Sequence, residues 1–301
     1  MKTFIKHISI LVVSFLVLVN GIALVSLCIL KNTTFYKPSF LVNSVKEKQF
    51  DYIILGASTG LTTLNTKKID KITGAKGINL SVDDTGMASH YLMLQHFLAE
   101  GKQTKYCVLA PSLSGLDTSL VRISDNDYRF LMFINRDYVY EYFSNIGHTT
   151  KGIVSKNSRW LPFLGISYYN AELFFPSLVC FINPKKRNRF DDRGNYAYPE
   201  RNTTFMGKQL KIKNITFNNR YLNKIKQLCK TNNIELVFYF SPLRSQKITY
   251  QPQEFLIIDH SFFLKEDMFF YDNIHVNSIG RRKTSESFAD ILKKEIIKDG
   301  Y

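Results

Sequence analysis

The chain has 301 residues, 45% of them hydrophobic and 22% charged. This composition fits one or two folded domains and excludes wholesale disorder, a collagen repeat and a cysteine-dense scaffold. Lys and Arg number 40 against 25 Asp and Glu, a net charge of +15, which favours an anionic partner (nucleic acid, anionic lipid or acidic polysaccharide) without choosing among them.

The first informative segment is the uncharged apolar run from Ile8 to Leu30. At about 1.5 Å per residue, a helix of this length can cross a hydrocarbon core of about 30 Å. Lys2 and Lys6 precede the run without any acidic residue, as in a signal-anchor whose N-terminus stays inside the cell. We therefore expect residues 1–31 to be a single-pass membrane anchor, followed by a linker at 32–49.

Two alternatives compete with a retained anchor. A cleaved signal peptide has an apolar region of about 7–15 residues and a small-residue exit, whereas this longer run ends in large residues. A lipoprotein anchor needs a small residue before Cys28, where Leu27 stands. Lysines also follow the run, so the orientation is less secure than the anchor itself, although long domains translocate regardless of their charge.

Strand and helix signals alternate behind the linker. Short apolar runs predict strands at 50–55, 76–80 and 105–110, and helical spacing predicts helices at 62–73 and 87–100. This order predicts a parallel sheet with helices on both faces, a three-layer α/β/α arrangement.

The alternation breaks over residues 118–215 and then resumes. A helix near 216–232, strands at 234–240 and 255–258, and a last helix at 278–298 complete the pattern. We therefore expect one α/β domain at 50–301 with an aromatic, basic insertion at about 118–215. Its apolar segment 161–182 is interrupted by polar residues and proline, which favours a cap or membrane-contacting structure over a second span.

Two short motifs carry candidate chemistry. Gly56-Ala57-Ser58-Thr59 directly follows the first strand, so Ser58 is expected at the carboxyl edge of the sheet, where open parallel sheets bind ligands. Asp272 and His275 lie three residues apart just before the last helix. A hydroxyl nucleophile needs a base such as His, and that base needs a carboxylate to orient it. Alone, the first motif is more often a turn with an N-cap serine. The second motif alone is equally compatible with a surface loop whose Asp forms the turn and whose His is solvated.

Together the motifs resemble those of the SGNH (GDSL-like) hydrolase family, in its membrane-anchored branch. The motifs that carry the resemblance are residues 55–59, 77–81, 108–112, 240–243 and 272–275. The resemblance covers most of residues 50–115 and 216–298, but not the insertion. It implies a flavodoxin-like parallel sheet. Relatives transfer or remove acyl groups, commonly acetyl, on bacterial surface polysaccharides, or take part in D-alanyl transfer to teichoic acid.

The resemblance assigns three roles: Ser58 as the nucleophile, His275 as the general base and Asp272 as its orienting carboxylate. The Ser58 backbone N–H is implied as one oxyanion donor. Gly56 belongs to the same motif.

The second oxyanion donor is the part of the pattern from which this chain departs. The family's second-block glycine falls where this chain has Ser81, Val82, Asp83 and Asp84, and the third-block Asn is absent near Ala110-Pro111-Ser112. Gly86 or Asn79 could donate instead. Asp83 reads as a capping residue or a substrate contact, and a carboxylate beside an oxyanion would oppose catalysis.

Neither a metal nor a cofactor is expected. The three cysteines outside the anchor are widely spaced. His90 and His96 do not share a helix face well, and no carboxylate or cysteine stands at ligand spacing from them.

The excess charge is concentrated in one window. Residues 185–230 hold 13 Lys or Arg against three acids, interleaved with aromatic residues. A solvated face is one reading of this window. Another is an inserted cap that meets an anionic glycan or the membrane face beside Ser58.

Two functions follow from these patterns. The first is a serine acyltransferase or esterase on the bacterial membrane, facing away from the cytoplasm, acting on a glycan and working with a membrane acyl-transfer partner. The second is an inactive subunit of the same fold that binds or assembles polysaccharide. Nucleic acid is not expected, because its only support is charge.

Overall fold

The computed structural model describes residues 1–113, 116, 122–146, 149–201 and 209–296. The chain divides into two compact units. One, the helical unit, consists of Met1–Val45 and Asp127–Asn188; the other, the α/β unit, consists of Lys46–Asn126 and Arg189–Tyr301. The expected insertion at about 118–215 is thus shared between the units: residues 127–188 lie in the helical unit, and the residues before and after them lie in the α/β unit.

The α/β unit is built on a five-stranded parallel sheet in the order β2-β1-β3-β5-β7, which is the flavodoxin-like order. Its strands are β1 (Gln49–Gly56), β2 (Gly77–Asn79), β3 (Gln103–Ala110), β5 (Glu235–Phe240) and β7 (Leu256–Asp259). All five predicted strands are therefore confirmed, as is the α/β fold class. In the centre, β1 pairs with β3 from Gln49↔Gln103 to Gly56↔Ala110.

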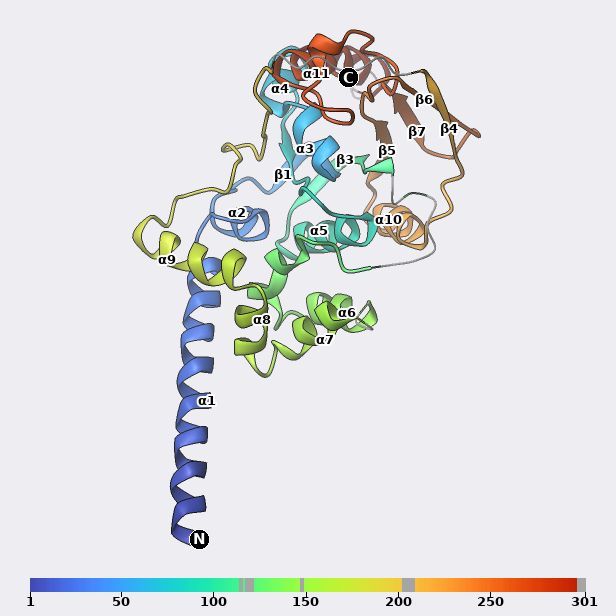
Figure 1. Cartoon of the computed structure of the whole chain (residues 1–301). Helices are drawn as coiled ribbons and strands as arrows, with labels where there is room; N and C mark the ends of the chain where they lie inside the picture. Colours follow the sequence, from blue (N-terminus) through green and yellow to red (C-terminus); the bar gives the residue numbers. More distant parts are fainter. Residues whose placement is uncertain (114–115, 117–121, 147–148, 202–208, 297–301) are drawn as a thin grey trace. The chain divides into compact units, whose positions relative to one another are not determined.

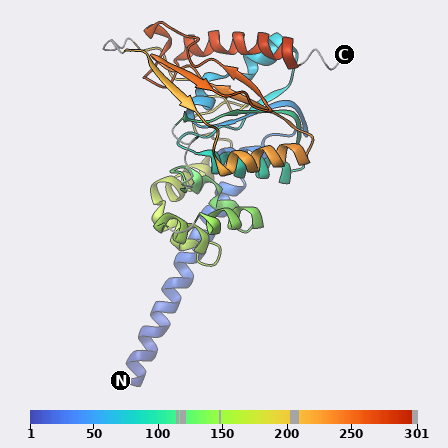
Figure 2. The same ribbon diagram turned by 90° about the vertical axis from the view of Figure 1, so that its right-hand side faces the viewer.

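Helices cover both faces of this sheet. The helices of the unit are α3 (Ser58–Thr63), α4 (Thr66–Thr73), α5 (Met87–Ala99), α10 (Arg220–Thr231) and α11 (Ser278–Ile291), with short turns η4 (Asp267–Phe269) and η5 (Leu292–Ile296). Helices α4 and α11 pack together on one face, and α5 and α10 on the other (Figures 1 and 2). Tyr52, Ile54 and Val108 from the sheet and Phe288 from α11 form part of a fully buried core.

One predicted helix is divided. The residues expected to form a single helix at 62–73 form α3 and α4 instead, separated by extended backbone at Leu64 and Asn65. The Asn79 side chain donates to the carbonyls of Gly60 (3.2 Å) and Leu64 (3.4 Å). The amide therefore satisfies carbonyl groups at the end of α3, where the helix would otherwise continue.

A second, two-stranded parallel sheet was not predicted. It pairs β4 (Lys211–Ile215) with β6 (Gln246–Tyr250). Both strands are short and mostly exposed, so neither carries the buried apolar run that identifies the strands of the main sheet.

The helical unit begins with α1 (Lys2–Lys31), which among the described residues is the one helix long and apolar enough to cross a membrane. Its other elements are α2 (Lys37–Asn43), η2 (Asp127–Phe133), α6 (Asp137–Asn145), α7 (Thr150–Asn157), α8 (Pro162–Tyr168), η3 (Asn170–Phe174) and α9 (Phe175–Ile182). The apolar segment 161–182 is thus broken into two short helices and a π-turn. Helices α8 and α9 both pack against α1 (Figure 1).

A buried histidine in the α/β unit makes its stability depend on pH. The His260 ring lies 3.2 Å from both the Tyr239 and the Ser287 hydroxyl oxygens, and burial lowers its pKa to about 4. Unfolded histidine titrates near 6.5. Below pH 6.5 this histidine takes up a proton in the unfolded chain but stays neutral in the folded chain. Stability therefore falls as the pH drops from about 6.5 toward 4.

Through His260, the parent should lose about 2 kcal/mol of its free energy of unfolding between pH 7 and pH 5. The His260→Gln variant should not show this part of the loss. Urea unfolding followed by circular dichroism at both pH values measures it. The comparison must be between variant and parent, because burial raises the pKa of Asp70 to about 6. That carboxyl gains a proton in the folded state and stabilises the fold in the opposite direction. Parallel pH curves for the two proteins would contradict the assignment.

Candidate active site

Ser58 stands at the carboxyl edge of the central strand β1. After Gly56 the backbone of Ala57 is extended, and Ser58 is the first residue of α3. The Ala57 N–H donates to the carbonyl of Ala110, the last residue of β3 (3.3 Å). Strand pairing therefore fixes the turn that presents the Ser58 hydroxyl, at the edge where parallel sheets bind ligands.

Asp272 and His275 lie in the loop between η4 and α11. The Asp272 Oδ1 accepts the backbone N–H groups of Ile274 (2.9 Å) and His275 (2.8 Å), and the Tyr271 N–H donates to the His275 carbonyl (2.9 Å). At the start of α11, the Asn277 side chain caps the helix. The loop is thus held by its own hydrogen bonds on one side and by a capped helix on the other.

The structure brings these three side chains into one chain of hydrogen bonds. His275 Nδ1 lies 2.8 Å from Asp272 Oδ2, and His275 Nε2 lies 2.8 Å from Ser58 Oγ. A carboxylate only accepts, so the Nδ1 proton belongs to the bond with Asp272. Nε2 is left with a lone pair toward the Ser58 O–H, the arrangement of a serine nucleophile and its general base.

The electrostatics favour an ionised Asp272. Burial alone raises the pKa of this carboxyl, but hydrogen bonds from the His275 ring and from the Ile274 and His275 N–H groups outweigh it and lower the pKa below its usual value. The Asp272 side chain is 41% exposed and that of His275 11%. A fixed negative charge therefore stands behind a largely enclosed imidazole, a position in which it can stabilise an imidazolium.

The residues expected to complete an oxyanion hole are mostly engaged elsewhere. The Ser58 N–H has no hydrogen-bond partner among the described residues. In contrast, the buried Asn79 amide donates to the carbonyls of Gly60 in α3 and of Leu64 just after it, and accepts from the Ser81 N–H (3.0 Å). The Gly86 N–H donates to Ser124 Oγ (2.9 Å). Asn79 and Gly86 thus have structural bonds where a free donor was expected.

Gly56 has a packing role. A Cβ at this position would meet the Ala110 carbonyl oxygen at 2.1 Å, so the close approach of β1 and β3 requires glycine.

The loop after β2 places Asp83 and Asp84 at the same sheet edge as Ser58. Asp83 is half-buried, and its carbonyl accepts from the Asn126 side chain (2.8 Å). Asp84 is exposed and has a φ of 50°, a left-handed conformation that favours glycine. This is the stretch in which the SGNH resemblance leads one to expect a glycine, and aspartate is one of the residues that tolerates the conformation.

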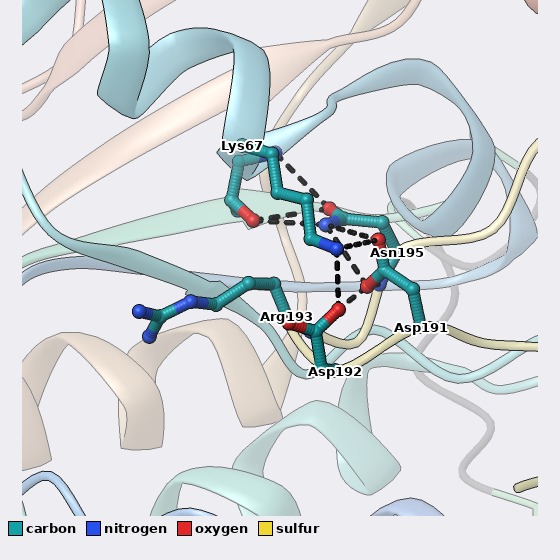
Figure 3. A network of polar contacts seen from close by, with 6 residues as sticks. Lys67, Asp191, Asp192, Arg193 and Asn195 are labelled. Atoms are coloured by element: carbon teal, nitrogen blue, oxygen red, sulfur yellow. Dashed lines mark hydrogen bonds and ion pairs between the residues drawn. The ribbon is translucent and has the colours of Figure 1, made fainter.

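The segment 191–201, which we call the arm, is the part of the site that the sequence did not reveal. Its first half is fixed to the start of α4 (Figure 3): Asp191 Oδ1 accepts from Asn195 N (2.9 Å), Asn195 Oδ1 accepts from Thr66 N (3.0 Å), and Lys67 pairs with Asp191 (3.4 Å) and Asp192. Polar residues of this kind are common in loops, so nothing in their spacing pointed to a site.

The second half of the arm lies along the loop between η4 and α11 that holds Asp272 and His275. Tyr198 forms a β-bridge with Asn277 and stacks on Tyr271, with ring centroids 4.2 Å apart. Its ring is also 5.2 Å from that of His275. Burial, followed by the charges of Tyr196, Asp272 and Asp83, raises the pKa of Tyr198. Partly exposed aromatic rings therefore stand beside the His275 imidazole.

The cations of the basic window are divided between the two units. Lys185, Lys186 and Arg187 belong to the helical unit, whereas the later cations belong to the α/β unit. Of these, Arg193 pairs with Glu47 (3.1 Å), and Lys226 of α10 pairs with Glu254 (3.3 Å). Arg201 lies 5.4 Å from the Tyr271 ring, and the expected cap also includes residues 202–208, which lie outside the described residues.

Comparison of the sequence with known proteins does not identify a family for this chain. No protein-family model matches the chain. No curated protein matches it.

Proposed function

We propose that this protein is a membrane-anchored serine acyltransferase or esterase that acts on O-acyl groups, acetyl foremost, of a bacterial cell-surface polysaccharide. The observation that carries the proposal is the continuous hydrogen-bonded chain from Ser58 through His275 to Asp272. Its three members come from opposite ends of an α/β unit with the flavodoxin-like strand order, which agrees with the SGNH resemblance in both fold and chain order.

The proposed reaction proceeds through an acyl-enzyme. Ser58 Oγ attacks the ester carbonyl while its proton passes to His275 Nε2. The tetrahedral intermediate then breaks its bond to the leaving alkoxide, which takes that proton and departs as an alcohol. A sugar hydroxyl or water next attacks the acyl-serine, with His275 again receiving the proton and returning it to Ser58.

Support for a carbohydrate on one side of this reaction comes from the arm. Partly exposed tyrosine rings at 196, 198 and 271 flank His275, with Arg201 beside them. Aromatic rings provide apolar surface with a polar hydroxyl tip, which suits the mixed polar and apolar surface of a sugar, and a nearby cation suits an anionic or acylated glycan.

Support for a retained anchor comes from the helical unit. Ala23, Leu27 and Leu30 of α1 are buried, and α8 and α9 pack against this helix. Removal of α1 as a signal peptide would therefore strip the unit of part of its core. A retained, single-pass α1 holds the protein at the cell membrane, and we assign the α/β unit to the extracytoplasmic side, within reach of a membrane acyl donor.

One observation favours a second function, an inactive subunit for polysaccharide binding or assembly. Asp83 and Asp84 occupy the loop that should supply an oxyanion donor, and a negative charge there disfavours a developing oxyanion. In that case Ser58 would never be acylated.

Covalent labelling separates the two functions. The tryptic peptide of residues 49–67 contains Ser58 as its sole serine. We expect a fluorophosphonate, and an activated acetyl ester after rapid acid quench, to modify this peptide in the full-length protein. Ser58→Ala should lose the adduct, and Ser167→Ala, a surface change in α8, should keep it. A folded parent protein that yields no adduct on this peptide would rule out the enzymatic proposal.

A further inference from the structure

Helix α9 has an inverted distribution of polar and apolar side chains. Its small residues Ser177 and Cys180 are 1% and 0% exposed, whereas Phe181 and Ile182 are 73% and 85% exposed. Phe175, Leu178 and Val179 are also exposed. A helix at a water-facing surface normally shows the opposite pattern. Small residues facing inward and large apolar residues facing outward are typical of helices packed within lipid.

The helix against which α9 packs shows the same pattern. On α1, Ala23 and Ser26 are buried, while Leu24 and Val25 are 55% and 59% exposed. The apolar surface of α1 therefore continues beside α9. By contrast, the stretch of α1 that is exposed at every residue ends at Leu18, and from Ile8 to Leu18 it spans about 16 Å, roughly half of a hydrocarbon core.

The charged residues are distributed in the way expected for a helix that ends at a membrane surface. Between Pro162 and Ile182 the sequence has a single charged residue, Glu172. Directly after α9 come Lys185, Lys186 and Arg187, and the Pro184 carbonyl accepts from the N–H of Thr34, just beyond the end of α1. A cationic cluster at the level where an apolar helix ends is suited to anionic lipid headgroups.

We propose that α9 lies in the outer leaflet beside α1, with Phe175, Leu178, Val179, Phe181 and Ile182 against lipid acyl chains and the cations at 185–187 at anionic headgroups. The inference rests on the proposed membrane anchoring and not on the chemistry of Ser58. The unit thereby contacts the membrane twice, once by a spanning helix and once by a half-inserted one, so that it cannot swing freely about α1.

Tryptophan fluorescence tests this placement, because Trp160 is the only tryptophan of the chain. In a Trp160→Phe background, three variants each carry a single tryptophan: Phe181→Trp is the α9 probe, Phe15→Trp the α1 probe, and Phe263→Trp the α/β probe. The full-length variants are placed in nanodiscs containing phosphatidylglycerol, with and without acyl-chain bromination. Phosphatidylcholine discs test the headgroup preference.

We expect the α9 probe and the α1 probe to lose most of their emission in brominated lipid and to resist aqueous acrylamide, and the α/β probe to show the reverse. Lys185→Gln with Lys186→Gln should weaken bromine quenching of the α9 probe in anionic discs.

Two results would overturn the proposal. In the first, bromine quenches the α1 probe while the α9 probe responds to acrylamide, which leaves the anchor intact and places α9 in water. In the second, neither reagent reaches the α9 probe and the disc holds a dimer, which assigns the face to a second copy instead. Labelling of Ser58 is measured in a separate experiment. A failure to label Ser58 would contradict the proposed activity but would leave the quenching result for α9 unchanged.

Discussion

Asp272→Asn is expected to lower the turnover of an acetyl ester by about a thousand- to ten-thousand-fold at neutral pH. The neutral amide can donate as well as accept, so it allows the imidazole of His275 to place its proton on Nε2, where it cannot accept the Ser58 proton. The amide also removes the negative charge that stabilises the imidazolium, a charge held in place by three hydrogen bonds to the carboxylate. Steady-state hydrolysis of a chromogenic acetyl ester measures the effect.

The neighbouring residue offers a matched control. Asn273 is exposed, and its backbone carbonyl accepts from the Arg244 N–H (3.1 Å). Asn273→Ala keeps that bond and should retain turnover within a few-fold. Fluorophosphonate labelling of Ser58 should slow in Asp272→Asn in parallel with turnover. Equal turnover in the parent and Asp272→Asn would show that the Asp272 carboxylate does not orient His275 for catalysis.

Gly56→Ala is expected to damage both the fold and the site. The new Cβ would stand 2.1 Å from the Ala110 carbonyl oxygen and 2.8 Å from its carbon, both of them backbone atoms that cannot turn aside. Forcing apart two paired central strands should cost about 3 kcal/mol and lower the melting temperature by about 6–12 °C. Calorimetry of the solubilised protein measures this.

The same displacement moves the turn at Ala57 that presents Ser58, so the surviving folded fraction should also lose turnover. Gly86→Ala is the matched control, because a Cβ there meets only the Ser124 hydroxyl at an ordinary 3.4 Å. Equal melting temperatures for the parent and Gly56→Ala would mean that β1 and β3 are not packed as closely as described.

The central sheet could be predicted because its strands are buried on both faces. Runs such as residues 52–55 and 107–110 have to be apolar and continuous, and that is a local property of the sequence. The pairing of Ser58 with His275 was implied by the resemblance to the SGNH family. The topology explains it, because a residue after the first strand and one before the last helix both reach the carboxyl edge, but the hydrogen bond between them is a finding of the structure.

The remaining features depend on contacts between distant residues. The arm is fixed by Asn195 binding Thr66, and the break between α3 and α4 by Asn79 binding Gly60 and Leu64. Each is a single amide that reads locally as an ordinary loop residue. The ion pairs of the basic window are equally distant in sequence: Arg193 and Lys226 are each paired with an acid from another segment.

The packing of α8 and α9 on α1 has a consequence for synthesis. Helix α1 leaves the ribosome first, yet α8 and α9, which pack against it, lie between residues 162 and 182. At about 5–20 residues per second, some 150 intervening residues delay that cover by about 8–30 s. In the proposed membrane anchor, lipid would cover this face of α1 until α8 and α9 are made. Insertion of the nascent chain into the membrane must therefore precede folding of the helical unit, and a chain that misses insertion would hold an apolar helix in water with no partner yet made.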